Sequence, residues 1–218
     1  MTIPSIPTRG RTLNYAASVY DVLEPLCLLS KQVEYDNTLI ATLKPGPADR
    51  ILDVGCGTGL LCQKISELLD PGQGGCITGI DAAGKMIEAA RKKRGTVHCR
   101  FEAMAAEHLD FPDGSFDGVI SSLFYHHVPL DLKEKSLQEA YRVLKAGGKL
   151  VIADMHTPTT FMGGFISHAS RWLLLQPQIG ENIRGMLPEL IHGAGFLPPQ
   201  IVAHYFGYIA LFSTTKPL

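Results

Sequence analysis

The 218-residue chain lacks the features that mark several large classes of protein. It has no block of like charge, and its net charge of −1 and pI near 6.7 argue against a dedicated nucleic-acid-binding protein, which is usually basic. No apolar run reaches the roughly 20 residues that span a bilayer. The closest, residues 161–175, is interrupted by His168 and Arg171. We therefore expect neither a nucleic-acid partner nor a transmembrane segment.

Cysteines are few and show no pattern of pairing. The chain has five cysteines, an odd number, which are irregularly spaced and include no C-x-x-C pair. They are Cys27, Cys56, Cys62, Cys76 and Cys99. The first ten residues carry turn-forming prolines and no apolar core, unlike a secretory signal. Both observations favour reduced thiols in a cytoplasmic protein. With 45% hydrophobic residues, the chain can bury a sizeable core within one domain.

What is present is a glycine-rich turn of the type that binds nucleotide cofactors. Residues 51–59 read ILDVGCGTG, an apolar run that ends in an acid and is followed by three glycines at alternate positions. The run predicts a buried strand, and the glycines predict a turn into a helix that begins near Leu60. Glycine lets a ligand approach the main chain closely, and the free N–H groups of the helix point into the turn.

Two details decide which cofactor suits this turn. A dinucleotide-binding turn has a third small residue at the position where this chain has Leu60. The acid within the motif, Asp53, suits a ligand with a positive amino group better than a pyrophosphate. A second acid, Asp81, ends the next apolar run, where a carboxylate can accept hydrogen bonds from ribose hydroxyls. The sequence therefore disfavours a dehydrogenase.

Strands and helices are expected to alternate along the chain. Strands are predicted at 50–54, 76–80, 97–102, 116–122 and 148–154, with helices at 59–69, 83–94 and 131–145. Two helices are predicted within 12–43, another over 180–193, and a closing hairpin over 199–205 and 208–215 with its turn at Gly207. Such alternation predicts an α/β fold with a mostly parallel sheet, whose ligands bind beyond the carboxyl ends of the strands.

Three blocks together resemble the class I S-adenosylmethionine (SAM)-dependent methyltransferases. The first is the glycine turn with Asp81; the second is FPDGSFDGV at 111–119; the third is AYRVLKAGGKL at 140–150. Within that family the chain is similar to the small-molecule group that includes quinone C-methyltransferases and small lipid N-methyltransferases, over roughly residues 15–216. The resemblance implies a Rossmann-like, seven-stranded, mostly parallel sheet with helices on both faces and a C-terminal antiparallel hairpin. It also implies SAM as cofactor.

The resemblance also implies a set of cofactor-binding residues. Asp53, Gly55, Gly57 and Gly59 would form the turn around the methionine end, Asp81 would hold the ribose, and Ala106 would meet the adenine. The remaining candidates are Cys56, Ala82, Met86, Ala105 and Ser122.

One departure from the family pattern concerns the adenine. Where the family often has Gly-Asp-Ala, this chain has Met104, Ala105 and Ala106, so a carboxylate is missing. The neighbouring Glu107 is expected to point elsewhere in an extended segment. This departure keeps a second hypothesis open, a SAM-binding protein that transfers no methyl group and acts as a rearrangement catalyst or regulator.

Candidate catalytic residues follow the strand at 116–122. The loop SSLFYHH contains His126 and His127, and the resemblance places it opposite the methyl group, with His127 the first choice as base or positioning group. Tyr20, in the first helix, is the third candidate. No fixed ligand spacing supports a metal site. The loop lacks the prolines of enzymes that methylate nucleic-acid bases or glutamine.

The division of the chain follows from these assignments. Residues 1–44 are expected to form an N-terminal helical lid, and 45–218 the methyltransferase domain. Within it, the apolar segment 157–178 is expected to form an insertion beside the acceptor. The acceptor is expected to be small and apolar or amphipathic, of the quinone, lipid or secondary-metabolite class. An exposed apolar segment would also allow peripheral membrane contact. The sequence indicates no oligomeric state.

Overall fold

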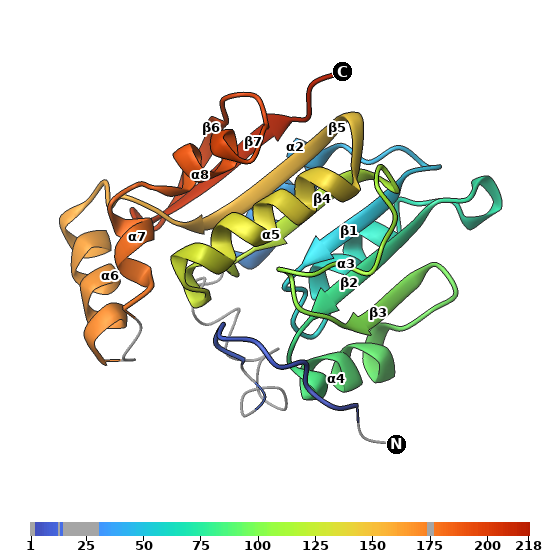
Figure 1. The fold of residues 1–218 in the computed structure, drawn as a ribbon, viewed down its shortest axis with the longest axis horizontal. Coiled ribbons are helices and arrows are strands. Elements are labelled where there is room, and N and C mark those ends of the chain that lie inside the picture. Colours follow the sequence, from blue (N-terminus) through green and yellow to red (C-terminus); the bar gives the residue numbers. More distant parts are fainter. Residues whose placement is uncertain (1–2, 13, 15–30, 174–176) are drawn as a thin grey trace.

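The fold is an α/β sandwich built on one seven-stranded sheet, shown by a computed structural model (Figure 1). The model describes residues 3–12, 14, 31–173 and 177–218. The expected first helix, with Tyr20, lies outside these residues. The strands are β1 (Arg50–Val54), β2 (Cys76–Asp81), β3 (Cys99–Ala103), β4 (Phe116–Ser122), β5 (Leu144–Met155), β6 (Gln200–Tyr205) and β7 (Ile209–Thr215). Their order in the sheet is β3-β2-β1-β4-β5-β7-β6.

The predicted sheet is confirmed in topology and direction. Strands β1 to β5 pair in parallel, whereas β7 runs antiparallel to both β5 and β6. The chain moves outward from β1 to β3 and then returns to the other side of β1 as β4. At such a reversal the connections on either side diverge, and a crevice opens beyond the carboxyl ends of the two central strands.

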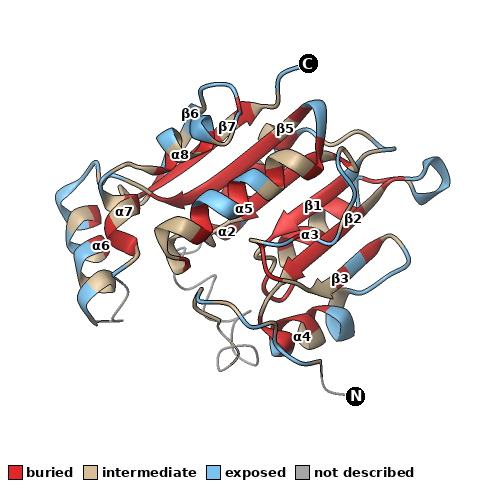
Figure 2. Ribbon diagram, in the orientation of Figure 1, coloured by how far each residue is buried: buried red, intermediate tan, exposed pale blue. Residues whose placement is uncertain are grey.

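Helices cover both faces because the strands alternate their buried side chains. Leu52 and Val54 pack toward α5 (Leu130–Val143) and α8 (Leu187–Gly193), whereas Ile51 packs toward the opposite layer. That layer consists of α2 (Gln32–Leu43), α3 (Leu60–Ser66) and α4 (Gly84–Arg94). The sheet is buried along most of its length (Figure 2). It gives the loops at its carboxyl edge a rigid base.

The prediction of one continuous helix over 180–193 is wrong. The chain forms two short helices there, α7 (Ile179–Ile183) and α8, separated at Gly185, whose φ of +76° is left-handed. A left-handed residue cannot continue a right-handed helix. Pro188 then falls in the first turn of α8, where a missing N–H does no harm.

Candidate functional site

The glycine turn after β1 is an open bend held by the neighbouring strand. Gly55, Gly57 and Gly59 have φ values of +77°, +53° and +82°. The N–H groups of Gly55 and Cys56 each donate to the carbonyl of Ile80 at 2.9 Å. A Cβ at Gly55 would lie 2.6 Å from the Phe124 ring, so both the backbone angle and the available space require glycine there.

The Asp81 carboxylate lies beside this bend at the tip of β2. Its oxygens accept hydrogen bonds from the N–H of Gly57 at 3.2 Å and of Ala83 at 2.8 Å. Burial nevertheless raises the pKa of Asp81, with those two N–H groups acting in the opposite direction. An acid held in this way presents its remaining lone pairs to whatever occupies the crevice.

The Asp53 carboxyl is almost completely buried. It is 1% exposed, and the Cys62 thiol donates to it at 3.1 Å. Burial raises the pKa of Asp53 from 3.8 to about 7, against the lowering effect of the Cys62 hydrogen bond and with a further rise from the Asp81 charge. A group that ionises near neutrality inside a cavity is a marker of a functional site.

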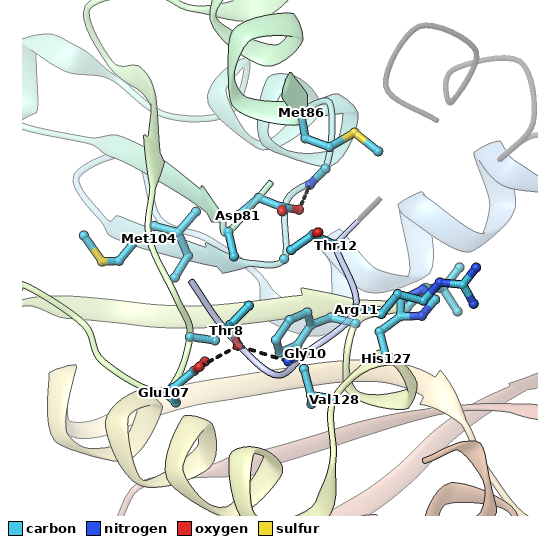
Figure 3. A pocket seen from close by; sticks show the side chains of 17 residues that line it. Thr8, Gly10, Arg11, Thr12, Asp81, Met86, Met104, Glu107, His127 and Val128 are labelled. Atoms are coloured by element: carbon cyan, nitrogen blue, oxygen red, sulfur yellow. Dashed lines mark hydrogen bonds between the residues drawn. The ribbon is translucent and has the colours of Figure 1, made fainter. Parts of the chain in front are cut away.

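Residues 3–12, here called the N-terminal strap, lie across the bend (Figure 3). The N–H of Ile6 donates to the Ala82 carbonyl at 2.9 Å, and that of Arg11 donates to the His127 carbonyl at 3.0 Å. The strap and the bend enclose a first cavity of about 50 Å³. This volume is too small to hold a nucleoside while the strap keeps this position.

Seven of the predicted site residues line this first cavity: Gly55, Gly57, Asp81, Ala82, Met86, Ala106 and His127. A second cavity on the other side of the bend shares Gly55 and Gly57 and is also lined by Asp53, Cys56 and Ser122. Of the remaining predicted residues that the structure describes, Ala105, Gly59 and His126 line neither cavity. Gly59 instead begins α3, where a Cβ would lie 2.4 Å from the Phe101 ring.

The expectation that Glu107 points elsewhere is wrong. Residues 105–108 form a turn rather than an extended segment, closed by a hydrogen bond from the His108 N–H to the Ala105 carbonyl at 3.1 Å. Glu107 therefore lines the first cavity, where it accepts a hydrogen bond from the Thr8 hydroxyl at 2.6 Å (Figure 3). A carboxylate does lie in this part of the site, one residue later than Ala106.

His126 and Asp154 form a buried pair at the ends of β4 and β5. The Nδ1 atom of His126 lies 2.7 Å from Oδ1 of Asp154, whose other oxygen accepts from the Tyr125 N–H at 2.6 Å. Asp154 is fully buried, and the His126 side chain is 12% exposed. A carboxylate on Nδ1 favours the tautomer that leaves Nε2 as a proton acceptor. The His127 ring lies 4.0 Å from the His126 ring and faces the first cavity.

Two residues of α2 that line the second cavity were not predicted. Gln32 and Asp36 come from α2, and the Gln32 amide donates to both Asp36 oxygens at 3.0 and 3.1 Å. Lys64 completes the charge balance of Asp36 at 2.8 Å. The Oε1 atom of Gln32 is buried and has no hydrogen-bond partner within the described part of the chain. A buried carbonyl of this kind is available to a ligand donor.

Two kinds of feature are absent from the part of the chain that the structure describes. Among the described residues, no group of three or more histidines, cysteines or acids is arranged to hold a metal ion. No helix in that same part of the chain is long and apolar enough to cross a membrane.

Comparisons with known proteins identify the family. The family described as "Methyltransferase domain" matches residues 52–152. A demethylmenaquinone methyltransferase from Desulfitobacterium hafniense is 32% identical over 216 residues, covering 93% of this chain and 81% of that protein. A ubiquinone/menaquinone biosynthesis C-methyltransferase from Wigglesworthia glossinidia brevipalpis is 31% identical, and the match covers 66% of this chain and 58% of that relative.

The solved structures agree on the fold. The crystal structure of the YcgJ protein from Bacillus subtilis superposes with a TM-score of 0.69, at 20% identity, over 86% of this chain and all of that one. The sequence match to the Desulfitobacterium enzyme spans nearly the whole of this chain and shows that the two proteins are related. This chain belongs to the class I SAM-dependent methyltransferases of the small-molecule type.

Proposed function

We propose that the protein transfers a methyl group from SAM to a small, apolar or amphipathic acceptor that carries an ionisable hydroxyl group. The observation that carries this proposal is the His126–Asp154 pair, next to the first cavity. The cofactor supplies an already reactive methyl group, so the protein has to align the acceptor and remove its proton. A hydroxyl is the acceptor group that gains most from a positioned imidazole, whether oxygen or a ring carbon made electron-rich by the oxyanion is methylated.

The two cavities suggest how SAM would lie across the bend. Its ribose hydroxyls would donate to Asp81, and its adenine would lie against Met86 and Ala106 in the first cavity. Its methionine end would reach the second cavity, where Asp53 and the Gln32 carbonyl would accept hydrogen bonds from the ammonium group. The strap would shift outward to admit the nucleoside.

The ribose contact gives a first prediction. Asp81→Ala should weaken SAM binding by about 10- to 100-fold, because hydrogen bonds to a charged group contribute roughly 1.5–3 kcal/mol. Isothermal titration calorimetry measures the change, and wild-type protein should release heat with SAM but not with NAD. The matched control is Asp113→Ala, whose carboxylate is 81% exposed and pairs with Arg142 away from the bend. Full-strength SAM binding by Asp81→Ala would show that the ribose lies elsewhere.

The unpartnered Gln32 carbonyl gives a second prediction. Gln32→Met removes the Oε1 acceptor, and also the amide donor to Asp36, with little change in side-chain volume. It should weaken SAM binding by roughly tenfold. Binding of 5′-methylthioadenosine, which lacks the amino-acid end, should not change. Calorimetry with both ligands separates a lost ammonium contact from a general disturbance of the site. Equal losses for the two ligands would contradict the assignment.

Methyl transfer itself is tested with SAM labelled in its methyl group. The protein is incubated with phenols and hydroquinones that carry apolar tails of different length, and labelled product is extracted into organic solvent. We expect label in the phenolic or hydroquinone products. A protein that binds SAM by calorimetry but labels none of these acceptors, nor any component of a metabolite extract, would instead support the non-transferring alternative.

A further inference from the structure

A close contact at one glycine determines which side of helix α6 (Phe161–Leu173) faces the rest of the protein. Thr160 begins the helix, and its hydroxyl accepts from the Gly163 N–H at 3.0 Å. Gly163 presses against the turn between β6 and β7 so closely that a Cβ would lie 2.2 Å from the Gly207 carbonyl oxygen. Only glycine fits this contact, so Gly163 must face inward. With 3.6 residues per turn, the direction of every other side chain of α6 follows from that one.

The consequence is a helix with its apolar side chains on the outside. Phe161, Met162, Phe165 and Trp172, here called the outward stripe, are 92, 62, 66 and 68% exposed. Ser167 and Gly163 are buried on the opposite side, and the Ser167 hydroxyl has no hydrogen-bond partner among the described residues. A surface helix normally shows the reverse arrangement. Figures 1 and 2 show α6 at the margin of the molecule, beyond the end of the sheet, with its outer side exposed.

The segment that carries the outward stripe contains one permanently charged side chain, the cationic Arg171. No aspartate or glutamate occurs between Asp154 and Glu181, whereas His168 and Arg171 both lie on α6. The Arg171 guanidinium lies 5.5 Å from the centre of the Trp172 ring. Exposed aromatic side chains accompanied by a cationic group, without acids, match the chemistry of an anionic lipid headgroup layer.

The outward stripe is also connected to the candidate catalytic pair. Helix α6 packs against α7, and Asn182 of α7 donates to the Met155 carbonyl at 3.0 Å and lies 3.4 Å from Asp154 Oδ1. A surface bound by α6 would therefore lie on the side of the molecule where α7 contacts Asp154 of the His126–Asp154 pair.

We propose that the outward stripe docks this protein reversibly on anionic phospholipid membranes. The aromatic side chains enter the headgroup region while Arg171 remains with the phosphates, and an amphipathic acceptor then reaches the site from the lipid phase. The last step rests on the proposed function; the docking itself does not. A single short helix with one nearby cation gives weak, salt-sensitive binding rather than permanent anchoring.

The chain offers its own probe for this proposal, because Trp172 is its single tryptophan. Full-length protein is titrated with vesicles of phosphatidylglycerol and phosphatidylcholine, and with vesicles of phosphatidylcholine alone. We expect a blue shift of tryptophan emission and co-sedimentation with the first kind, at least tenfold stronger than with the second, and weakened by added salt. Neither SAM nor acceptor is present, so the result does not depend on methyl transfer.

Two sets of substitutions make the test specific. Phe161→Ser with Phe165→Ser should abolish both signals, and unfolding of this variant should match wild type because both side chains are exposed. The matched control, Ile201→Ser with Val202→Ser, alters apolar side chains of β6 that are 46 and 50% exposed, and should bind vesicles like wild type. Loss of labelling with a water-soluble phenol while vesicle binding is retained would count against the proposed function alone.

Three results would overturn the proposal: no emission shift with either vesicle, equal loss in the control variant, or a stripe covered in another way. A stripe covered by a second copy of the chain would give tryptophan emission that is blue-shifted before vesicles are added and that changes with protein concentration. Light scattering would then give the mass of a dimer.

Discussion

Replacing Asp53 with asparagine is expected to abolish SAM binding while making the ligand-free protein more stable above pH 7. The carboxyl is buried, and burial raises its pKa from 3.8 to about 7. In the unfolded chain the same group loses its proton near pH 4, so the folded state is progressively penalised as pH rises from about 4 to 7. Above pH 7 the penalty is complete and is on the order of 4 kcal/mol.

Asparagine keeps the shape of the side chain, can still accept from the Cys62 thiol, and never ionises. Its stabilising effect should therefore be small at pH 4 and largest at pH 8, as measured by urea denaturation at both values. A gain of the same size at both pH values would mean that the Asp53 charge is not its cause.

The same carboxyl makes a pH-dependent prediction for wild-type protein. If ionised Asp53 holds the SAM ammonium, affinity for SAM should rise between pH 6 and 8, whereas affinity for 5′-methylthioadenosine should stay level. The Asp53→Asn variant should lose SAM affinity by at least about 100-fold, because a charge pair in a buried cavity is removed on one side only. Retained SAM affinity in this variant would refute the role of Asp53.

The second large effect is expected at the His126–Asp154 pair. His126→Asn should lower kcat by about 10²- to 10⁴-fold and leave the dissociation constant for SAM unchanged, because the residue acts on the acceptor proton and not on the cofactor. His127→Asn is the matched comparison, since its ring adjoins the first cavity but does not pair with Asp154 in the structure. A smaller loss is expected there.

A series of acceptors distinguishes a base from a structural residue. The loss in His126→Asn should shrink as the hydroxyl of the acceptor becomes more acidic, and should nearly vanish for a nitrophenol that is already ionised at the assay pH. Single-turnover transfer of labelled methyl measures it. An equal loss for all acceptors would show that His126 only shapes the loop.

The sequence identified the parts of the site that depend on local backbone chemistry. The glycine bend, Asp53 and Asp81 are marked by residue types that short segments require, and the mostly parallel sheet follows from the alternation of strands and helices. The position of Glu107 was not predicted because the turn at 105–108 contains no glycine or proline. The helix break at Gly185 was missed for the opposite reason, because a lone glycine is tolerated in many helices.

Contacts between distant segments could not be predicted in the same way. The sequence preferred His127 over His126, and nothing in SSLFYHH says which ring meets a carboxylate that lies 28 residues further on. Gln32 occupies an ordinary position in a helix, and only the packing of α2 on the sheet brings it to the cavity that Asp53 also lines. Tyr20 stays a prediction, outside the described residues.

The N-terminal strap has a practical consequence for work with this protein. The main-chain N–H of Ile3 bonds to Glu88 of α4, so a purification handle fused ahead of it would be attached directly to the strap. The carboxyl terminus lies at the end of the sheet opposite the carboxyl ends of the parallel strands, where the Lys216 N–H donates to the Gly148 carbonyl at 2.9 Å (Figure 1). Handles, fluorophores and sensor-chip attachment therefore belong at the carboxyl terminus, where they cannot compete with ligand entry.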